Sequence, residues 1–130
     1  MITNITNKEK LIYPELSYKL MGILFEVHNK LGNKYQEKHY QKAIAIKLGK
    51  YSLLDKKEVQ IKTKFEDEEL GEFFADFIIN NQILLETKVI WKISQNDIKQ
   101  VLRYLEATGL KLGIIANFKH NKLEFRRVLN

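Results

Sequence analysis

The chain has 130 residues, and its 22 Lys and Arg against 16 Asp and Glu give a formal net charge of +6. A hydrophobic share of 45% and a charged share of 29% are typical of a globular domain and exclude a disordered or collagen-like chain. The absence of cysteine excludes disulfide scaffolds, cysteine-ligated zinc and thiol catalysis. We expect one domain over residues 1–130, with a polar N-terminal segment over residues 1–10.

No apolar run approaches the roughly 20 residues of a membrane span. The first residues also lack a signal-peptide core, so we expect a soluble cytoplasmic protein without a membrane partner. The charge is uneven, at +5 over residues 1–60, −3 over 61–100 and +4 over 101–130. An acidic centre between basic flanks suits a metal-dependent enzyme that acts on a polyanion, although a solvated Lys-rich surface gives the same pattern.

Two helices are predicted first. Pro14 is typical of a first helical position, and the apolar residues from Leu16 to Leu31 recur at helical spacing. Gly32-Asn33 ends this helix. A second helix is predicted over Gln36 to Leu48, with Gly49 as its stop.

Three strands follow. Val59 to Phe65 alternate between apolar and polar residues, as a half-buried strand does, and Glu66 to Gly71 form a charged turn. Phe73 to Ile79 and Ile83 to Trp91 are mostly apolar strands, joined by a tight turn at Asn80-Asn81.

The last part of the chain predicts a helix and two strands. Ser94 and Asp97 form a capping box, and Gly109 closes the helix. Its inner stripe is predicted to consist of Ile98, Val101, Leu102 and Leu105. Strands are expected over Leu112 to Asn117 and Leu123 to Leu129. The order ααβββαββ indicates an α/β (α+β) fold, with helices packed on a mixed sheet.

Charged residues stand in the two apolar strands. An unpaired Asp76 there would cost several kcal/mol, so it needs a cation or hydrogen-bond donors, although a lone strand Asp is often a structural hydrogen-bonder. Glu86 and Lys88 project from one face, which also fits a simple ion pair.

Antiparallel pairing around the turn at Asn80-Asn81 brings Asp76 next to Glu86. Two adjacent carboxylates repel unless a proton or a metal lies between them. With Lys88 beside them, the site suits Mg²⁺ or Mn²⁺, which prefer oxygen ligands. Such an ion would hold a water and a phosphate oxygen, while the lysine positions that water and offsets developing charge.

Asp76 followed after nine residues by Glu86-Thr87-Lys88 resembles the PD-(D/E)xK nuclease superfamily, which implies a restriction-endonuclease-like core. Between about residues 10 and 128, further segments look like the bacterial GxxExxY proteins, which are grouped with that superfamily. These segments include Leu11-Ile12-Tyr13-Pro14-Glu15-Leu16-Ser17, Phe25-Glu26-Val27-His28-Asn29, Glu37-Lys38-His39-Tyr40, Tyr104-Leu105-Glu106-Ala107-Thr108-Gly109 and Asn117-Phe118.

The resemblance implies roles for particular residues. Asp76 and Glu86 would be metal ligands, with the Thr87 carbonyl as a third and Lys88 as the catalytic lysine. Glu26 would be the additional acidic residue that many superfamily members place near the metal.

Two further pairs are implied as substrate-binding or supporting residues. Gln100 and Tyr104 match the Gln-x-x-x-Tyr pattern of RecB-like nucleases, and their shared helix face looks either onto the site or onto water. Glu37 and Tyr40 carry the GxxExxY motif, and their spacing with Ile44 favours a buried role. A first-turn Glu that interacts with the helix dipole is the equal alternative for Glu37.

The sequence departs from the family pattern at two positions. Ala75 stands where the superfamily name has proline, and Lys34 stands where the first glycine of GxxExxY is expected, so Gly32 or Asn33 would take over that turn. Trp91 either stacks on a base or anchors a strand end.

The leading hypothesis is a divalent-metal-dependent nuclease that hydrolyses DNA or RNA phosphodiester bonds with Mg²⁺ or Mn²⁺. The alternative is a catalytically silent nuclease-fold module that binds nucleic acid or a partner protein, and a homodimer is a third alternative. No base-reading motif distinguishes DNA from RNA.

Overall fold

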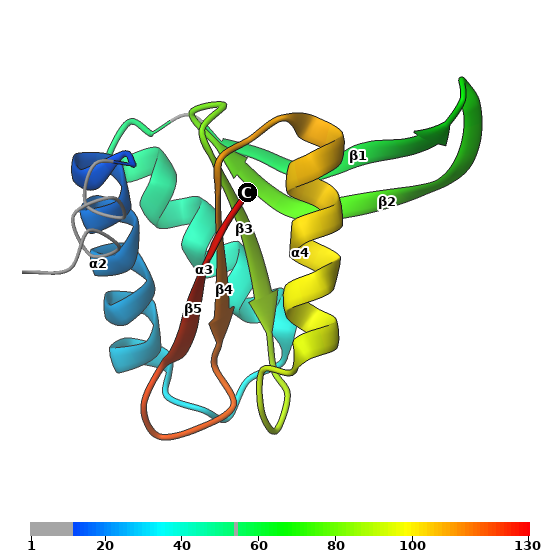
Figure 1. Cartoon of the computed structure of the whole chain (residues 1–130). Coiled ribbons are helices and arrows are strands. Elements are labelled where there is room, and N and C mark those ends of the chain that lie inside the picture. The colour runs from blue at the N-terminus through cyan, green and yellow to red at the C-terminus, as the bar shows by residue number, and fades with distance from the viewer. Residues whose placement is uncertain (1–11, 54) are drawn as a thin grey trace, which may run out of the picture.

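The computed structural model describes residues 12–53 and 55–130, so the polar segment predicted over residues 1–10 lies outside the described residues (Figure 1). The chain forms helices α2 (Pro14–Leu31) and α3 (Glu37–Lys50), strands β1 (Asp55–Phe65), β2 (Glu68–Ile79) and β3 (Ile83–Lys88), helix α4 (Gln95–Thr108), and strands β4 (Leu112–Asn117) and β5 (Glu124–Leu129). The predicted order ααβββαββ is confirmed over the described residues.

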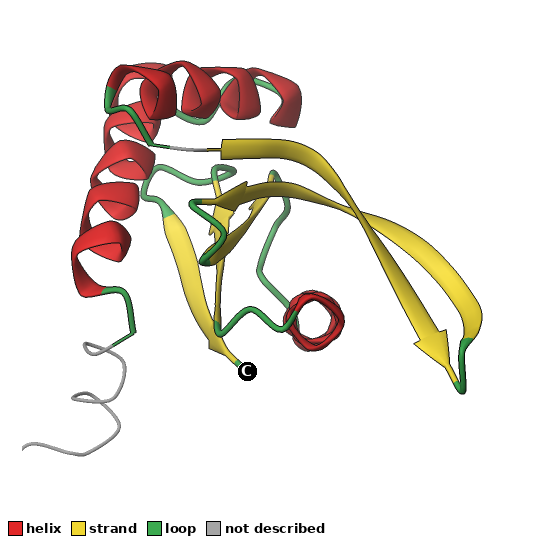
Figure 2. Cartoon of the chain, turned by 90° about the horizontal axis from the view of Figure 1, so that it is seen from above, coloured by secondary structure: helices red, strands yellow, loops and turns green. Residues whose placement is uncertain are grey.

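The strands form one mixed sheet in the order β1-β2-β3-β4-β5. Strands β3 and β4 are parallel, and the other neighbours are antiparallel. Helices α2 and α3 cover one face, while α4, seen end-on in Figure 2, covers the other. Each side encloses its own apolar core, so the predicted α+β fold with a sheet flanked by helices is confirmed.

Local sequence explains where several elements begin and end. Pro14 occupies the first turn of α2, and Ser94 and Asp97 form the predicted capping box of α4. Gly109 ends α4 in the left-handed conformation, with φ of 76°. In β4, a Cβ on Gly113 would lie 2.5 Å from Val101 Cγ1, so glycine is what lets α4 approach the sheet closely.

Some predicted boundaries differ. Strand β2 begins at Glu68 because the turn is only Glu66-Asp67, both with positive φ, as a two-residue hairpin turn requires. The hairpin therefore extends as a long arm away from the sheet (Figure 2). Strand β3 ends at Lys88 rather than Trp91, whose side chain is 79% exposed and is no hydrophobic anchor.

Two helix predictions also need correction. Helix α3 continues through Gly49 to Lys50. In α4, Leu102 is exposed, whereas Tyr104 is buried with Val101 and Leu105. The inner face is therefore rotated from the predicted stripe towards Tyr104.

Strand β2 changes its side-chain faces at Asp76. Simple alternation would place Phe73, Ala75, Phe77 and Ile79 on one face of the strand. In the structure they are divided between the two faces. Phe73 and Ala75 pack in the core under α4, and Phe77 and Ile79 in the core under α2 and α3. The register of β1 and β2 places Glu58, which has a positive φ of 51°, opposite Asp76. This irregularity in both strands accompanies the start of the arm.

Candidate active site

Strands β2 and β3 separate immediately after a short ladder of three residue pairs that ends at Phe77 and Leu85. Asp76 and Glu86 are the next pair in this register, because the turn that joins the strands has three residues, Asn80 to Gln82. The Asp76 backbone N–H donates to Glu86 Oε1 at 3.0 Å, and the Thr87 backbone N–H donates to Asp76 Oδ2 at 2.7 Å. Each carboxylate thus accepts a hydrogen bond from a backbone N–H of the neighbouring strand. We call this place, where the strands separate at Asp76 and Glu86, the fork.

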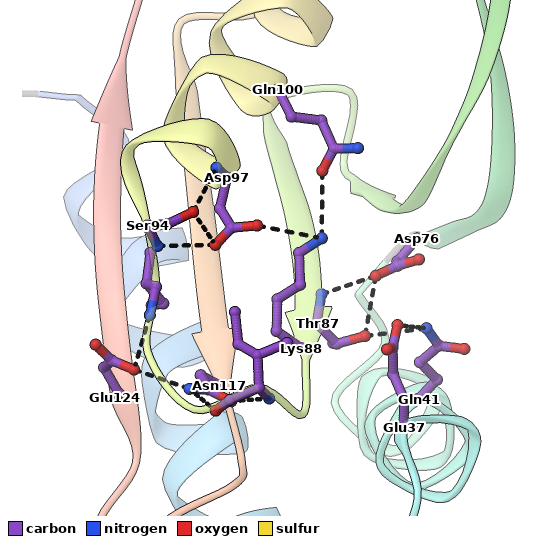
Figure 3. Close-up of polar contacts among 12 residues, drawn as sticks. Glu37, Gln41, Asp76, Thr87, Lys88, Ser94, Asp97, Gln100, Asn117 and Glu124 are labelled. Atoms are coloured by element: carbon purple, nitrogen blue, oxygen red, sulfur yellow. Dashed lines mark hydrogen bonds and ion pairs between the residues drawn. The ribbon is translucent and has the colours of Figure 1, made fainter.

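Helix α3 is tied to the fork by a chain of hydrogen bonds (Figure 3). The Thr87 hydroxyl donates to Asp76 Oδ2 at 2.9 Å. Gln41 Nε2 donates to Thr87 Oγ1 at 3.0 Å and to Glu37 Oε1 at 3.1 Å. Glu37 therefore stands beside the fork, but it is exposed, so the buried role that its spacing favoured is wrong. Sequence reasoning missed Gln41, although its position four residues after Glu37 places both on one helix face.

Helix α4 holds Lys88 from the other side of the fork (Figure 3). Lys88 Nζ donates to Gln100 Oε1 at 3.2 Å and lies 3.9 Å from Asp97 Oδ1. Tyr104 is buried one turn further along the same side of α4. The sequence left open whether Gln100 and Tyr104 face the site or water. In the structure their side of α4 faces the site. Asp97 was predicted as a cap but not as a neighbour of Lys88.

The segment after Lys88 is fixed by Asn117. The Phe118 backbone N–H donates to the Lys88 carbonyl at 2.9 Å. The Asn117 side chain donates to the Ile90 carbonyl at 2.8 Å and accepts from the Ile90 N–H at 3.0 Å. Asn117 also donates to Glu124 Oε1 at 2.8 Å (Figure 3). These bonds hold the chain where it leaves the fork, although sequence spacing gives Asn117 no such role.

Negative charge accumulates at the fork. Burial, and then the charge of Asp76, raise the pKa of Glu86 from 4.5 to about 8, and Lys88 opposes this effect. Glu86 is only 5% exposed. Loss of solvent and the charge of Asp76 also raise the pKa of Glu37. Burial, and then the charge of Glu86, raise the pKa of Tyr104. One lysine does not balance these carboxylates, so the fork needs a proton or a further cation.

The donor atoms at the fork fit a hard divalent cation. Asp76 Oδ1 and Glu86 Oε2 accept no hydrogen bond from the described residues. Because the N–H and C=O of a strand residue point to the same side, the Thr87 carbonyl faces the fork with its N–H. Within residues 12–53 and 55–130, no group of three or more His, Cys, Asp or Glu is arranged to hold a metal. Mg²⁺, however, is usually bound by one or two carboxylates together with waters and substrate phosphates.

Glu26, which the resemblance placed near a metal, is not brought to the fork. Its Oε2 lies 2.7 Å from Lys47 Nζ and 3.1 Å from Lys30 Nζ. These two lysines lower the pKa of Glu26, whereas the charges that act on Glu37 are Asp76 and Lys88. The third carboxylate beside the fork is therefore Glu37.

Tyr40 fixes the loop that precedes Glu37. The ring is fully buried and stacks on Phe118 with centroids 4.5 Å apart. Its hydroxyl donates to the Gly32 carbonyl at 2.6 Å and accepts from the Tyr35 N–H at 3.3 Å. Lys34 stands at the position of the first motif glycine, and Gly32, with φ of 70°, provides the positive-φ turn instead. Tyr40 thus supports the site without entering it.

Comparison with known proteins agrees with this fold. A model of the PD-(D/E)XK nuclease superfamily matches residues 14–128, and the chain belongs to this superfamily. The match does not single out the GxxExxY proteins.

The fold is also similar to a solved structure, the crystal structure of SSO0001, with a TM-score of 0.52 and 13% sequence identity. The similarity covers 85% of this chain but only 65% of that one. A search of the curated proteins found no match. In the part of the chain that the structure describes, no helix is long and apolar enough to cross a membrane.

Proposed function

We propose that the chain is a divalent-metal-dependent nuclease that hydrolyses DNA or RNA phosphodiester bonds at the fork. The observation that carries this proposal is the meeting of Asp76, Glu86 and Lys88 in a member of a nuclease superfamily. The raised pKa of Glu86 adds support, because it marks a site with too little positive charge.

Asp76 and Glu86 would hold Mg²⁺ or Mn²⁺, with the Thr87 carbonyl as a third ligand. Such an ion would supply an activated water and would neutralise charge on the phosphate. Glu37 borders the same space and would add a further oxygen, either directly or through water. Its link to the fork through Gln41 supports this assignment.

Lys88 would bring positive charge to the reacting phosphate. Its ammonium group would donate a hydrogen bond to the attacking water or to a phosphate oxygen, and it would offset negative charge that develops in the transition state. Gln100 and Asp97 position this group from α4, since both contact Nζ. Tyr104, one turn after Gln100 on the same helix, would support that position.

The test is a cleavage assay with wild type, Lys88→Ala and a control, Lys19→Ala, on the exposed side of α2. Each protein is incubated with labelled single- and double-stranded DNA and RNA, with Mg²⁺, Mn²⁺ or a chelator. Wild type and Lys19→Ala should cleave with metal, and Lys88→Ala should lose about 100-fold or more in rate. Equal cleavage by all three would refute the assignment of Lys88. No cleavage by any of them would favour the catalytically silent binding module.

A further inference from the structure

A second concave surface lies beside α4. The outer half of the β1–β2 hairpin curves away from the sheet, and α4 lies on its concave side (Figure 2). Between them is a cavity of about 710 Å³, which is within the range of ligand-binding pockets. It is lined by Lys62 and Lys64 of β1, Leu70 and Phe73 of β2, and Arg103 and Ala107 of α4. We call this surface the arm groove.

The arm groove combines positive charge with apolar side chains. Among the lining residues, Lys62, Lys64 and Arg103 carry three positive charges and Glu106 one negative charge, while Glu72 stands opposite Lys62 in the β1–β2 ladder. Leu70 is 70% exposed. The Arg103 guanidinium lies 6.0 Å from the centroid of the neighbouring Phe73 ring. Cationic and apolar groups side by side suit a ligand that carries both phosphates and exposed bases.

The arm groove continues from the fork along one face of α4. Arg103 and Ala107 follow Gln100 at i+3 and i+7, so all three lie on the same side of the helix. Gln100 hydrogen-bonds to Lys88 in the fork. In addition, Phe73 of the arm groove lies 5.6 Å from Tyr104, between ring centroids.

The acidic tip of the hairpin limits the path of a bound polyanion. Glu66 to Glu69 form the turn and the start of β2, and none of these four residues lines the arm groove. Phosphates would be repelled from this tip. A polyanion in the arm groove would therefore run along α4 towards the fork rather than outward along the arm.

We propose that the arm groove binds the single-stranded segment of a nucleic acid whose adjoining phosphodiester lies in the fork. Phosphates would contact Lys62, Lys64 and Arg103, while bases would lie against Phe73 and Leu70. The inference rests on the proposed function for the placement of the scissile bond. Single strands are favoured over duplexes because a duplex presents sugars and phosphates outward and stacks its bases inside, away from an apolar surface.

The test measures binding in the Lys88→Ala background, without metal, so that it does not depend on cleavage. The groove variant is Lys62→Gln/Lys64→Gln/Arg103→Gln. A remote control, Lys19→Gln/Lys111→Gln/Lys122→Gln, removes the same charge from exposed positions outside the arm groove. A second control, Lys62→Arg/Lys64→Arg/Arg103→Lys, keeps the charge. The probes are fluorescein-labelled oligo-dT, oligo-U and a DNA duplex, followed by anisotropy between about 50 and 200 mM salt.

The groove variant should bind both single strands about 30- to 100-fold more weakly at about 100 mM salt, because three phosphate contacts are lost. The slope of log K against log salt should become shallower by about 2. The remote and charge-keeping controls should bind like the parent, and the duplex should bind more weakly than either single strand. Equal weakening by the groove and remote variants would overturn the proposal, as would preferential binding of the duplex.

A cleavage assay separates this inference from the proposed function. In the wild-type background, the groove variant should retain metal-dependent hydrolysis of thymidine 5′-p-nitrophenyl phosphate, which is too small to reach the arm groove, but show a raised KM for oligonucleotides. An unchanged KM for oligonucleotides would refute binding in the arm groove but would leave the proposed nuclease function intact. Oligonucleotide binding that depends on the arm groove, without hydrolysis of any substrate, would refute the proposed nuclease function but support binding in the arm groove.

Discussion

Replacing Glu86 with glutamine isolates the free-energy cost of a buried carboxylate in the metal-free fork. Burial and the charge of Asp76 raise the pKa of Glu86 from 4.5 to about 8. Below pH 4.5 the folded and unfolded chains both carry this proton, so there is no cost. As the pH rises, the unfolded chain loses the proton first, and stability falls until the folded chain also loses it near pH 8.

The difference between the two pKa values sets the size of the effect. At about 1.4 kcal/mol per pKa unit, it corresponds to about 5 kcal/mol above pH 8, with about 4 kcal/mol already lost at pH 8. This is a large part of the roughly 5–15 kcal/mol that stabilises a typical domain. Glutamine has nearly the same shape and keeps an acceptor for the Asp76 N–H, but it does not titrate.

The assay is urea unfolding followed by far-UV circular dichroism between about pH 5 and 9, with a chelator present. The difference in unfolding free energy between Glu86→Gln and wild type should change in favour of Glu86→Gln by several kcal/mol as the pH rises across this range. The exposed control Glu106→Gln should follow wild type. Parallel curves for wild type and Glu86→Gln would refute the reasoning that Glu86 is a protonated, desolvated carboxyl group.

Unfolding measurements at one pH test the packing that supports the fork. Gly113→Ala should lower the unfolding free energy by about 1–3 kcal/mol, because the new Cβ would meet Val101 Cγ1 at 2.5 Å. Gly22→Ala should raise it by about 0.5–1 kcal/mol, since an added Cβ there meets no atom within 4 Å and alanine favours the helix. Equal effects of the two substitutions would contradict this account of α4 packing. Tyr40→Phe should lower it by about 1–2 kcal/mol through loss of the bond to the Gly32 carbonyl, and an unchanged midpoint would contradict that role.

The register of the fork could be predicted because it depends on local sequence. Asn80 and Asn81 both adopt positive φ, of 55° and 56°, which asparagine tolerates better than most residues. The turn includes Gln82 as well, because Ile79 pairs with Ile83, and this three-residue turn sets the register in which Asp76 comes next to Glu86. Because the surrounding strand residues are apolar, the two carboxylates could be recognised in the sequence as unusual positions.

The change of faces at Asp76 could not be predicted from β2 alone. Strict alternation holds only while a strand stays regular, and the irregularity involves Glu58 on β1. The arm also changes the surroundings of α4, since Phe73 covers Tyr104. Without that contact, the helical pattern placed Leu102 on the inner face, whereas the structure buries Tyr104 there.

The choice between Glu26 and Glu37 likewise depends on tertiary contacts. Lys30, four residues after Glu26, is a local sign of a surface ion pair, but Lys47 completes the pair from the neighbouring helix. Glu37 gave only an ambiguous signal, because a first-turn Glu commonly interacts with the helix dipole. Its place beside Asp76 follows from how α3 packs on β3.

Binding of Mn²⁺ by isothermal titration calorimetry tests the central claim most directly, because it requires no knowledge of the substrate. At pH 7, wild type should bind Mn²⁺ and release about one proton, since Glu86 must ionise to become a ligand. Glu86→Gln should lose both the binding and the proton release, and Glu26→Gln should keep both. Loss of binding in Glu26→Gln, or unchanged binding in Glu86→Gln, would contradict a divalent-cation site at the fork.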